Sequence, residues 1–158
     1  RRLTMSSHTV SKLATLAIVL AFTGGQTAEP EDVRMQLVRE GRFVYFAELD
    51  SITRDGANAR MRSVQLSAEP SAIGGKNYIG GYSWWQFDCI AKTGQRMDYA
   101  SLRDDLVIGP VMPIDGPVIE LSPGGEAAEL AAVACGWVEP RVDATHLSKA
   151  IQLTRDAD

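Results

Sequence analysis

Two cysteines carry the clearest chemistry in the sequence, because Cys89 and Cys135 are the only two that the chain contains. An even number of cysteines in an exported protein favours a disulfide. A metal site is the alternative reading, but His146 is the only histidine beyond the first 28 residues. We therefore expect a Cys89–Cys135 disulfide, which should stabilise the fold by about 4 kcal/mol in the chain-entropy model.

A serine in the middle of the chain has neighbours that begin like a hydrolase motif. Residues Gly81 to Trp85 read Gly-Tyr-Ser-Trp-Trp, which starts as a nucleophile elbow does but lacks its final glycine and its strand-to-helix turn. The general base would have to be His146, in a weak C-terminal helix. Ser83 is therefore not predicted to be a nucleophile.

Glycines and carboxylates elsewhere give no stronger signal. Gly74-Gly75-Lys76-Asn77 lacks the upstream glycine and the following serine or threonine of a phosphate loop, so it reads as a turn. Asp104-Asp105, and Asp50 with Asp55, have no metal-loop spacing and read as solvated turn acids. We expect no catalytic residue, no cofactor and no metal, and so a protein that is not an enzyme.

The first 28 residues read as a signal peptide. An unbroken apolar run from Leu13 to Phe22 follows Lys12, and it is too short to span a bilayer. Small residues follow it, so cleavage after Gly25 or after Ala28 is expected, with Met5 as the start. The alternatives are a twin-arginine signal at Arg1-Arg2, whose consensus neighbours are absent, and a buried N-terminal helix.

The predicted mature chain is acidic. Three of the 16 cations lie in the signal segment and none of the 20 acids does, which leaves 13 cations against 20 acids, a net charge of −7. Nucleic acid is therefore excluded as an expected partner. We also expect no stable membrane insertion once the signal is removed.

Strands dominate the middle of the chain. The patterns predict a strand over 42–50, and a hairpin partner over 59–66 with a bulge near Arg62-Ser63, where the apolar face switches. Gly74-Gly75 and Gly80-Gly81 are predicted to bracket a flexible link before the strongest strand, 82–90. A further strand covers 96–102, and prolines limit 106–108 and 117–121 to short edge strands.

Helical periodicity replaces alternation near residue 122. Ser122 is expected to cap a helix over 127–134 that Gly136 ends, and Asp143 to cap a short helix through Leu153. The predicted fold is α+β, an antiparallel sheet with a C-terminal helix tethered to one face by the disulfide. On a helical wheel Ala128, Ala131 and Ala132 share the side of Cys135.

Strand alternation divides the residues around Cys89 between two faces. Ser83, Trp85 and Phe87 are expected to face the tethered helix, and Tyr82, Trp84 and Gln86 the opposite side. A tryptophan there makes these three residues the candidate partner contact. The alternative is that the first hairpin, a terminal helix or a second subunit covers Trp84.

Several segments taken together resemble the surface-adhesin protein E-like domain of bacteria. They are the strand ending Leu49-Asp50-Ser51-Ile52, the segment Tyr82 to Cys89, Tyr99, and the closing helix from Leu130 to Cys135, within 42–137. The resemblance implies a sheet with a disulfide-tethered helix, and adhesion to host matrix and serum proteins. It transfers no binding residues, and because no lipobox cysteine is present, a soluble periplasmic or secreted role stands beside display on the cell surface.

The expected organisation is a signal peptide over 1–28, a segment over 29–41, the domain over 42–137 and a tail with a short helix over 138–158. The expected function is that of an exported, non-enzymatic envelope or surface module that binds an envelope or host protein, with a homodimer as an alternative. The alternative functions are those of a small periplasmic inhibitor or of a small hydrolase.

Overall fold

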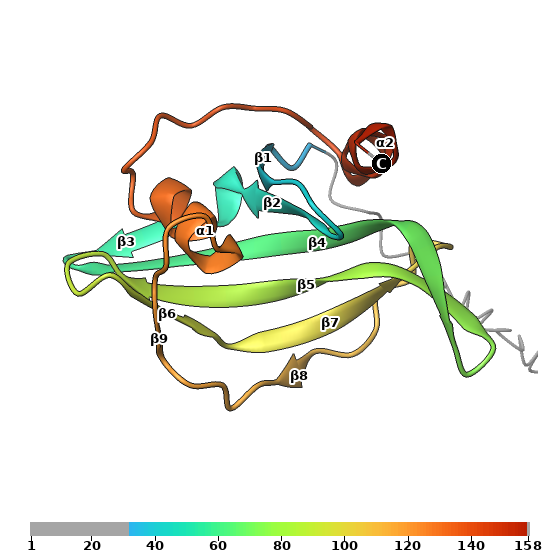
Figure 1. Ribbon diagram of the computed structural model, residues 1–158, viewed down its shortest axis with the longest axis horizontal. Coiled ribbons are helices and arrows are strands. Elements are labelled where there is room, and N and C mark those ends of the chain that lie inside the picture. The colour runs from blue at the N-terminus through green and yellow to red at the C-terminus, as the bar shows by residue number, and fades with distance from the viewer. Residues whose placement is uncertain (1–31, 158) are drawn as a thin grey trace, which may run out of the picture.

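The computed structural model describes residues 32–157, so the predicted signal peptide and its cleavage sites lie outside the described residues. The described chain forms one nine-stranded antiparallel sheet and two α-helices (Figure 1). The strands are β1 (Met35–Arg39), β2 (Val44–Glu48), β3 (Thr53–Asp55), β4 (Asn58–Ile73), β5 (Lys76–Asp88), β6 (Thr93–Arg96), β7 (Asp98–Arg103), β8 (Met112–Pro113) and β9 (Ile119–Glu120). A 3₁₀ turn, η1 (Leu49–Ser51), follows β2, and the helices are α1 (Glu126–Ala134) and α2 (Leu147–Asp156).

Most strands of the sheet pair with a neighbour in sequence, and among the described strands β9, which pairs with β6, is the exception. The strand order is β1-β2-β4-β5, after which β6 and β7 both run along β5, β9 pairs with β6 and β8 pairs with β7. The short β3 pairs with the start of β4. The predicted antiparallel sheet with a C-terminal helix is therefore confirmed, in a fold that is mostly β.

The bulge predicted at Arg62-Ser63 is not found in β4. The apolar pattern that suggested it arises because two helices cover different parts of the sheet. The pairing of β4 with β5 is unbroken from Asn58 to Leu66, and its register shifts only between Leu66 and Ser71. Met61 belongs to the core cluster under α1, whereas Val64 and Leu66 belong to the cluster that contains residues of α2. The apolar side of β4 changes because a different helix covers each face.

The glycines of the predicted flexible link instead hold two strands close together. Gly74 and Gly75 form the two-residue turn between β4 and β5, with φ of +57° and +73°, as a type I′ hairpin turn requires. β5 continues through Gly80 and Gly81. A Cβ on Gly80 would lie 1.9 Å from the Gln65 carbonyl oxygen, and one on Gly81 would lie 2.4 Å from the Tyr99 ring. Only glycine fits at these close approaches.

Both predicted helices form, but neither predicted cap is used. Gly125 is the N-cap of α1, and the chain turns before it through the hydrogen bond from the Gly125 N–H to the Ser122 carbonyl, 3.0 Å. His146 is the N-cap of α2. The Asp143 carboxylate instead accepts from the Leu37 N–H at 2.9 Å, so it ties the segment before α2 to β1.

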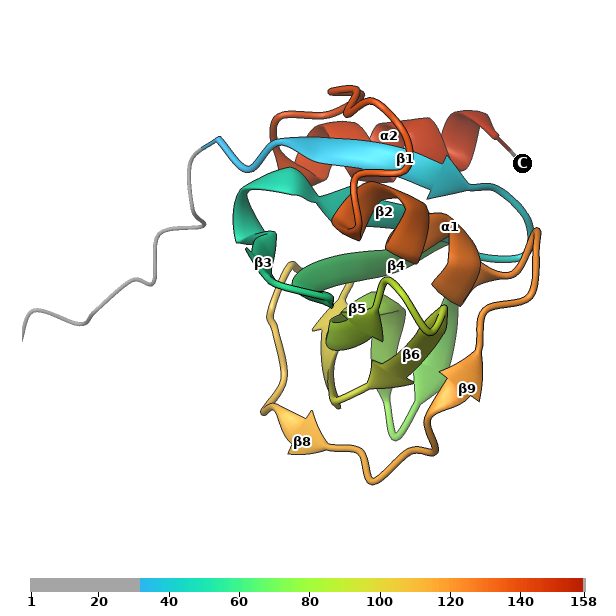
Figure 2. The ribbon, with the colours of Figure 1, turned by 90° about the vertical axis from the view of Figure 1, so that its left-hand side faces the viewer.

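The ends of the described chain are parts of the same fold. β1 lies in the segment predicted as 29–41 and pairs with β2, and α2 lies in the segment predicted as a tail. Leu147 and Ala150 of α2 are buried in one core cluster with Met35 of β1. Figure 2 shows α2 at the end of the molecule where β1 lies, and α1 lying across β2 and β4. α1 contacts β1, β2, β4 and β6, whereas the strand that α2 chiefly contacts is β4.

Candidate interaction site

The disulfide joins the end of β5 to the end of α1. Cys89 and Cys135 are bonded, with their Cα atoms 5.7 Å apart, which confirms the predicted tether. Ser83, Trp85 and Phe87 are buried on the same face of β5, as alternation predicts. The Trp85 and Phe87 rings stack with centroids 5.9 Å apart, and both belong to the core cluster under α1.

The buried side of α1 differs from the predicted one. Its buried residues are Ala127, Leu130, Ala131, Val133 and Ala134. Ala128 and Ala132 are only half-buried, although the wheel placed them with Cys135. The reason is that Cys135 is the C-cap and is itself half-buried, so the disulfide reaches the sheet from the margin of the helix contact.

A second tether holds the same end of α1, and sequence reasoning missed it. Arg54 in β3 donates from Nε to the Ala134 carbonyl at 2.7 Å and from Nη2 to the Val133 carbonyl at 3.2 Å. A cation at a helix C-terminus satisfies carbonyls that lack an intrahelical partner and favours the helix dipole. No sequence signal could have found this contact, because Arg54 lies 80 residues from Ala134.

The opposite face of β5 carries arginines interleaved with aromatic rings. Trp84 lies opposite Arg62 in the ladder, and Gln86 lies opposite Arg60. The guanidinium carbon of Arg60 is 4.4 Å from the Trp84 ring centroid, and that of Arg62 is 5.0 Å from the Tyr82 ring centroid. Both distances lie in the range of cation–π contacts. We call these five residues the arginine–aromatic face.

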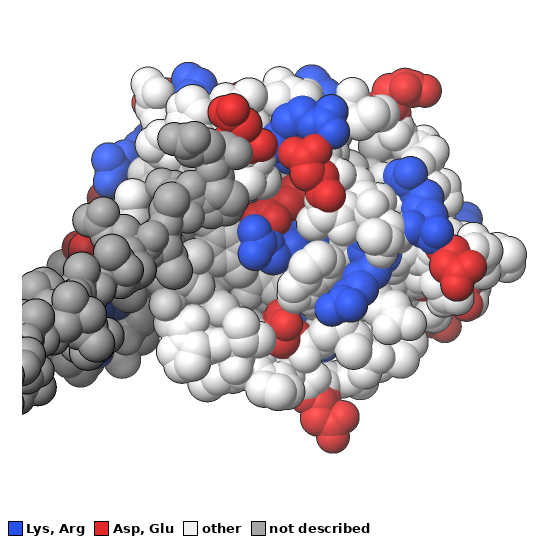
Figure 3. Space-filling view, turned by 180° about the vertical axis from the view of Figure 1, so that it is seen from behind, with Lys and Arg blue, Asp and Glu red and all other residues white. Residues whose placement is uncertain are grey.

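The three predicted contact residues are brought together on this face, but they differ in burial. Gln86 is exposed, whereas Tyr82 and Trp84 are half-buried. Tyr82 packs against the core cluster that contains residues of α2. Among residues 32–157, Trp84 packs against neither core cluster. Figure 3 views the molecule from the side opposite α1, where basic and acidic side chains lie side by side.

A buried ion pair fixes one of the two arginines. Arg62 Nε donates to Glu48 Oε2 at 2.5 Å, and Glu48 is only 3% exposed. Burial raises the pKa of Glu48, and the hydrogen bond from Arg62 opposes that rise. The Arg62 N–H also donates to Ser51 Oγ at 2.8 Å. Arg62 is therefore held over Tyr82 by contacts within the protein.

Arg62 is paired with Glu48, whereas the charge of Arg60 can still pair with a carboxylate of a partner. Arg60 is exposed and is in none of the four ion pairs found among residues 32–157. Its flat guanidinium contacts the Trp84 ring. An arginine that stacks on a ring still presents its N–H donors at the edge of the guanidinium plane, where they can bind a carboxylate. This face can therefore offer an ordered apolar surface and a positive charge to a partner.

The residues weighed for catalysis lie in ordinary structural positions. Ser83 is buried inside β5, where its Oγ accepts from Arg96 Nε at 2.7 Å, and no strand-to-helix turn follows it. His146 is the N-cap of α2, with Nδ1 3.0 Å from Thr145 Oγ1. Asp50 pairs with Arg34, and Asp105 with Arg103.

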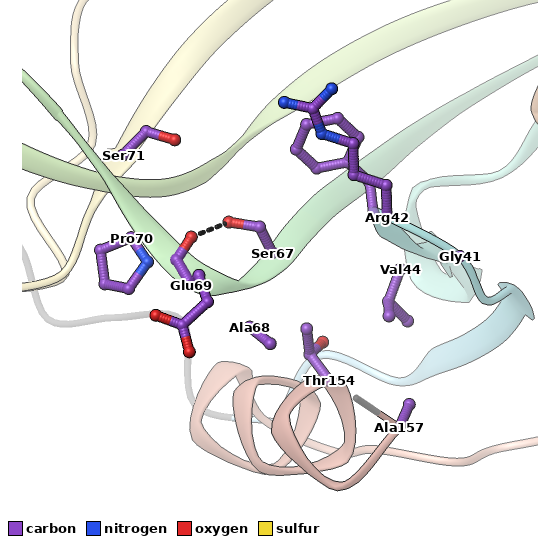
Figure 4. Close-up of a pocket in the computed structure, with 11 residues that line it drawn as sticks. Gly41, Arg42, Val44, Ser67, Ala68, Glu69, Pro70, Ser71, Thr154 and Ala157 are labelled. Atoms are coloured by element: carbon purple, nitrogen blue, oxygen red, sulfur yellow. Dashed lines mark hydrogen bonds between the residues drawn. The ribbon is translucent and has the colours of Figure 1, made fainter.

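A pocket lies away from this face, between the end of α2 and the irregular stretch of β4. It has a volume of about 280 Å³ and is lined by Gly41, Arg42, Phe43, Val44, Ser67, Ala68, Glu69, Pro70, Ser71, Thr154 and Ala157. Figure 4 shows the Arg42 guanidinium and the Glu69 carboxylate pointing in different directions. The Ser67 hydroxyl donates to the Glu69 carbonyl, and the Thr154 hydroxyl to the Ala150 carbonyl. These polar groups serve the local fold.

In the part of the chain that the structure describes, no three His, Cys, Asp or Glu residues come together as a metal site would require. Within the same residues, neither helix has the length and apolar character needed to cross a membrane.

The chain matches no protein-family model, and no curated protein matches its sequence.

Proposed function

We propose that this protein is an exported, non-enzymatic module that binds another protein through its arginine–aromatic face. The observation that carries the proposal is Trp84, a large aromatic side chain that lies outside both core clusters and under the exposed guanidinium of Arg60. Tryptophan, tyrosine and arginine are the residues most enriched among interface hot spots.

The face has the preorganisation that an efficient interface needs. Its side chains stand on two central strands, and the Glu48–Arg62 pair orients one end of the array. Side chains that are already ordered lose less conformational entropy on binding. The charge of Arg60, which is in no ion pair among residues 32–157, favours a partner that presents a carboxylate at the contact.

The resemblance to the surface-adhesin protein E-like domain supports a binding role of the same kind. It suggests an envelope protein, or a host matrix or serum protein, as the partner. Export is supported by the apolar run of residues 13–22 and by the disulfide, which persists in oxidising compartments.

The proposal is tested with two tryptophan variants of the oxidised protein. Trp84→Ala should weaken capture of envelope or host matrix proteins, or self-association, by about 5- to 30-fold. Trp137→Ala is the matched control, because Trp137 is 44% exposed and lies beyond α1 instead of on β5. The proposal is wrong if Trp84→Ala captures the same proteins as tightly as the parent. Selective capture of a hydrolase would instead favour an inhibitor.

A further inference from the structure

One edge of the sheet is formed by an irregular segment that follows β7. After β7 the chain turns back and runs antiparallel to it, with Ile108 bridging Leu102 and Met112 paired with Tyr99. It then reaches β6, where Ile119 pairs with Gly94. We call residues 106–119 the apolar edge segment. It shares no residue with the arginine–aromatic face.

The apolar edge segment exposes an unusual number of large apolar side chains. Each is between 41% and 64% exposed, and they are Leu106, Val107, Ile108, Val111, Met112, Val118 and Ile119. They account for seven of the twelve large apolar residues that are exposed among residues 32–157. Single exposed apolar side chains are normal on a protein surface, whereas a gathering of large ones within residues 106–119 favours an interaction site.

The turn that begins this segment holds a leucine in an unfavourable backbone conformation. Leu106 has φ of +65°, which costs a residue with a branched side chain roughly 1–2 kcal/mol. Hydrogen bonds brace the turn: the Arg103 N–H donates to the Val107 carbonyl at 3.0 Å, and the Leu106 N–H to the Arg103 carbonyl at 3.0 Å. Leu106 is 41% exposed, so burial of its side chain does not offset the strain. Strain of this kind is concentrated at functional sites.

Prolines exclude one way of using this edge. Pro110, Pro113 and Pro117 lack the N–H that a new β-strand would need for a continuous ladder. A partner strand cannot extend the sheet along the whole segment. Continuous strand addition is therefore excluded, and the exposed apolar side chains are the surface that the segment offers along its whole length.

The charges within the segment and at its two ends restrict its occupant, and Asp105 among them is paired with Arg103. Residues 104–121 contain four acids, Asp104, Asp105, Asp115 and Glu120, and neither lysine nor arginine. Asp115 and Glu120 are in none of the four ion pairs among the described residues. A second copy of this segment, or an anionic lipid surface, would meet like charge. A partner with basic side chains would meet opposite charge.

We infer that the apolar edge segment docks an apolar segment of another protein that carries lysine or arginine. Apolar contact with Val111, Met112 and Val118 supplies the affinity, and Asp115 and Glu120 attract the cations. The contact is a side-chain interface, without addition of a strand.

The test uses two synthetic amphipathic peptides, one of leucine and lysine and a twin with glutamate in place of lysine. The oxidised protein should bind the lysine peptide and not the glutamate twin. The double variant Val111→Ser/Val118→Ser should bind the lysine peptide about tenfold more weakly. Ile73→Ser is the matched control, because Ile73 is 64% exposed, as Val111 is, but lies at the β4–β5 hairpin. Thermal unfolding checks that each variant is folded.

Four results would overturn the inference. They are failure of the parent to bind the lysine peptide, equal binding of the twin, equal binding by the double variant, and loss of binding in the Ile73→Ser control. Sedimentation with anionic vesicles and sedimentation velocity of the protein alone test the other occupants. If the double variant abolished vesicle binding or dimerisation instead of peptide binding, the occupant would be a lipid surface or a second copy. Trp84→Ala should leave peptide binding unchanged, which separates this site from the arginine–aromatic face.

Discussion

Trp84 and Trp85 are neighbours in β5, and strand alternation sends them to opposite faces. Trp85 is buried under α1, stacks on Phe87 and donates from Nε1 to Ser63 Oγ at 3.1 Å. Trp84 stays half-buried beneath the guanidinium of Arg60. Two residues of one type, one position apart, thus serve packing on one face and surface presentation on the other.

The largest expected effect is loss of the buried tryptophan. Trp85→Ala should lower the free energy of unfolding by about 3–5 kcal/mol, because it leaves a cavity beside Phe87 and removes the donor to Ser63. Urea unfolding measures this. A loss below about 1 kcal/mol would contradict the placement of Trp85 in the core under α1.

The next effect concerns the tether on the same face. Replacing both Cys89 and Cys135 with alanine should cost about 2–4 kcal/mol, since the bond closes a sequence separation of 46 residues. The measurement is urea unfolding of the double variant beside the oxidised parent. Two free thiols in the native protein, detected with a thiol reagent, would contradict the tether itself.

A smaller effect, on the pH dependence of stability, follows from the buried carboxylate of Glu48. Burial raises the pKa of Glu48, so the folded state binds that proton more tightly than the unfolded chain does. Its contribution to stability is therefore present at low pH and is lost as pH rises from the ordinary glutamate pKa of about 4.3 through the raised value. Glu48→Gln should flatten this decline in unfolding free energy with pH.

Asp50 provides the control of opposite sign for that measurement. Its hydrogen bonds with Arg34 lower the pKa of Asp50, so its contribution is present above the ordinary aspartate pKa and is lost as pH falls through the lowered value. Asp50→Asn should therefore flatten only the acid side of the profile. A Glu48→Gln profile parallel to that of the parent would show that Glu48 is not the group responsible.

Local patterns in the sequence account for the features that depend on neighbouring residues. The number of cysteines predicted the disulfide, and strand alternation predicted the shared face of Ser83, Trp85 and Phe87. Neither prediction required knowledge of which strands pair. The predicted bulge in β4 was wrong because it assumed that one face of the sheet is covered. Knowing that α2 also packs on the sheet requires the tertiary structure.

Contacts between distant strands were beyond sequence reasoning for the same reason. The stacking of Arg60 on Trp84 depends on the register of β4 against β5, and that register differs from the one beside the glycine turn because it shifts between Leu66 and Ser71. The Arg54 contact with α1 and the Asp143 contact with β1 likewise join residues far apart in the chain. Neither residue has a local pattern that names its partner.

The arginine–aromatic face is tested most directly by measuring folding stability and association on one variant, Trp84→Ala. The interface account predicts that unfolding free energy falls by less than about 1 kcal/mol, because only a half-buried cation–π contact is lost. Partner capture or self-association of the same protein should weaken by about 5- to 30-fold. A loss of several kcal/mol in stability with association unchanged would make Trp84 a core residue and contradict the account.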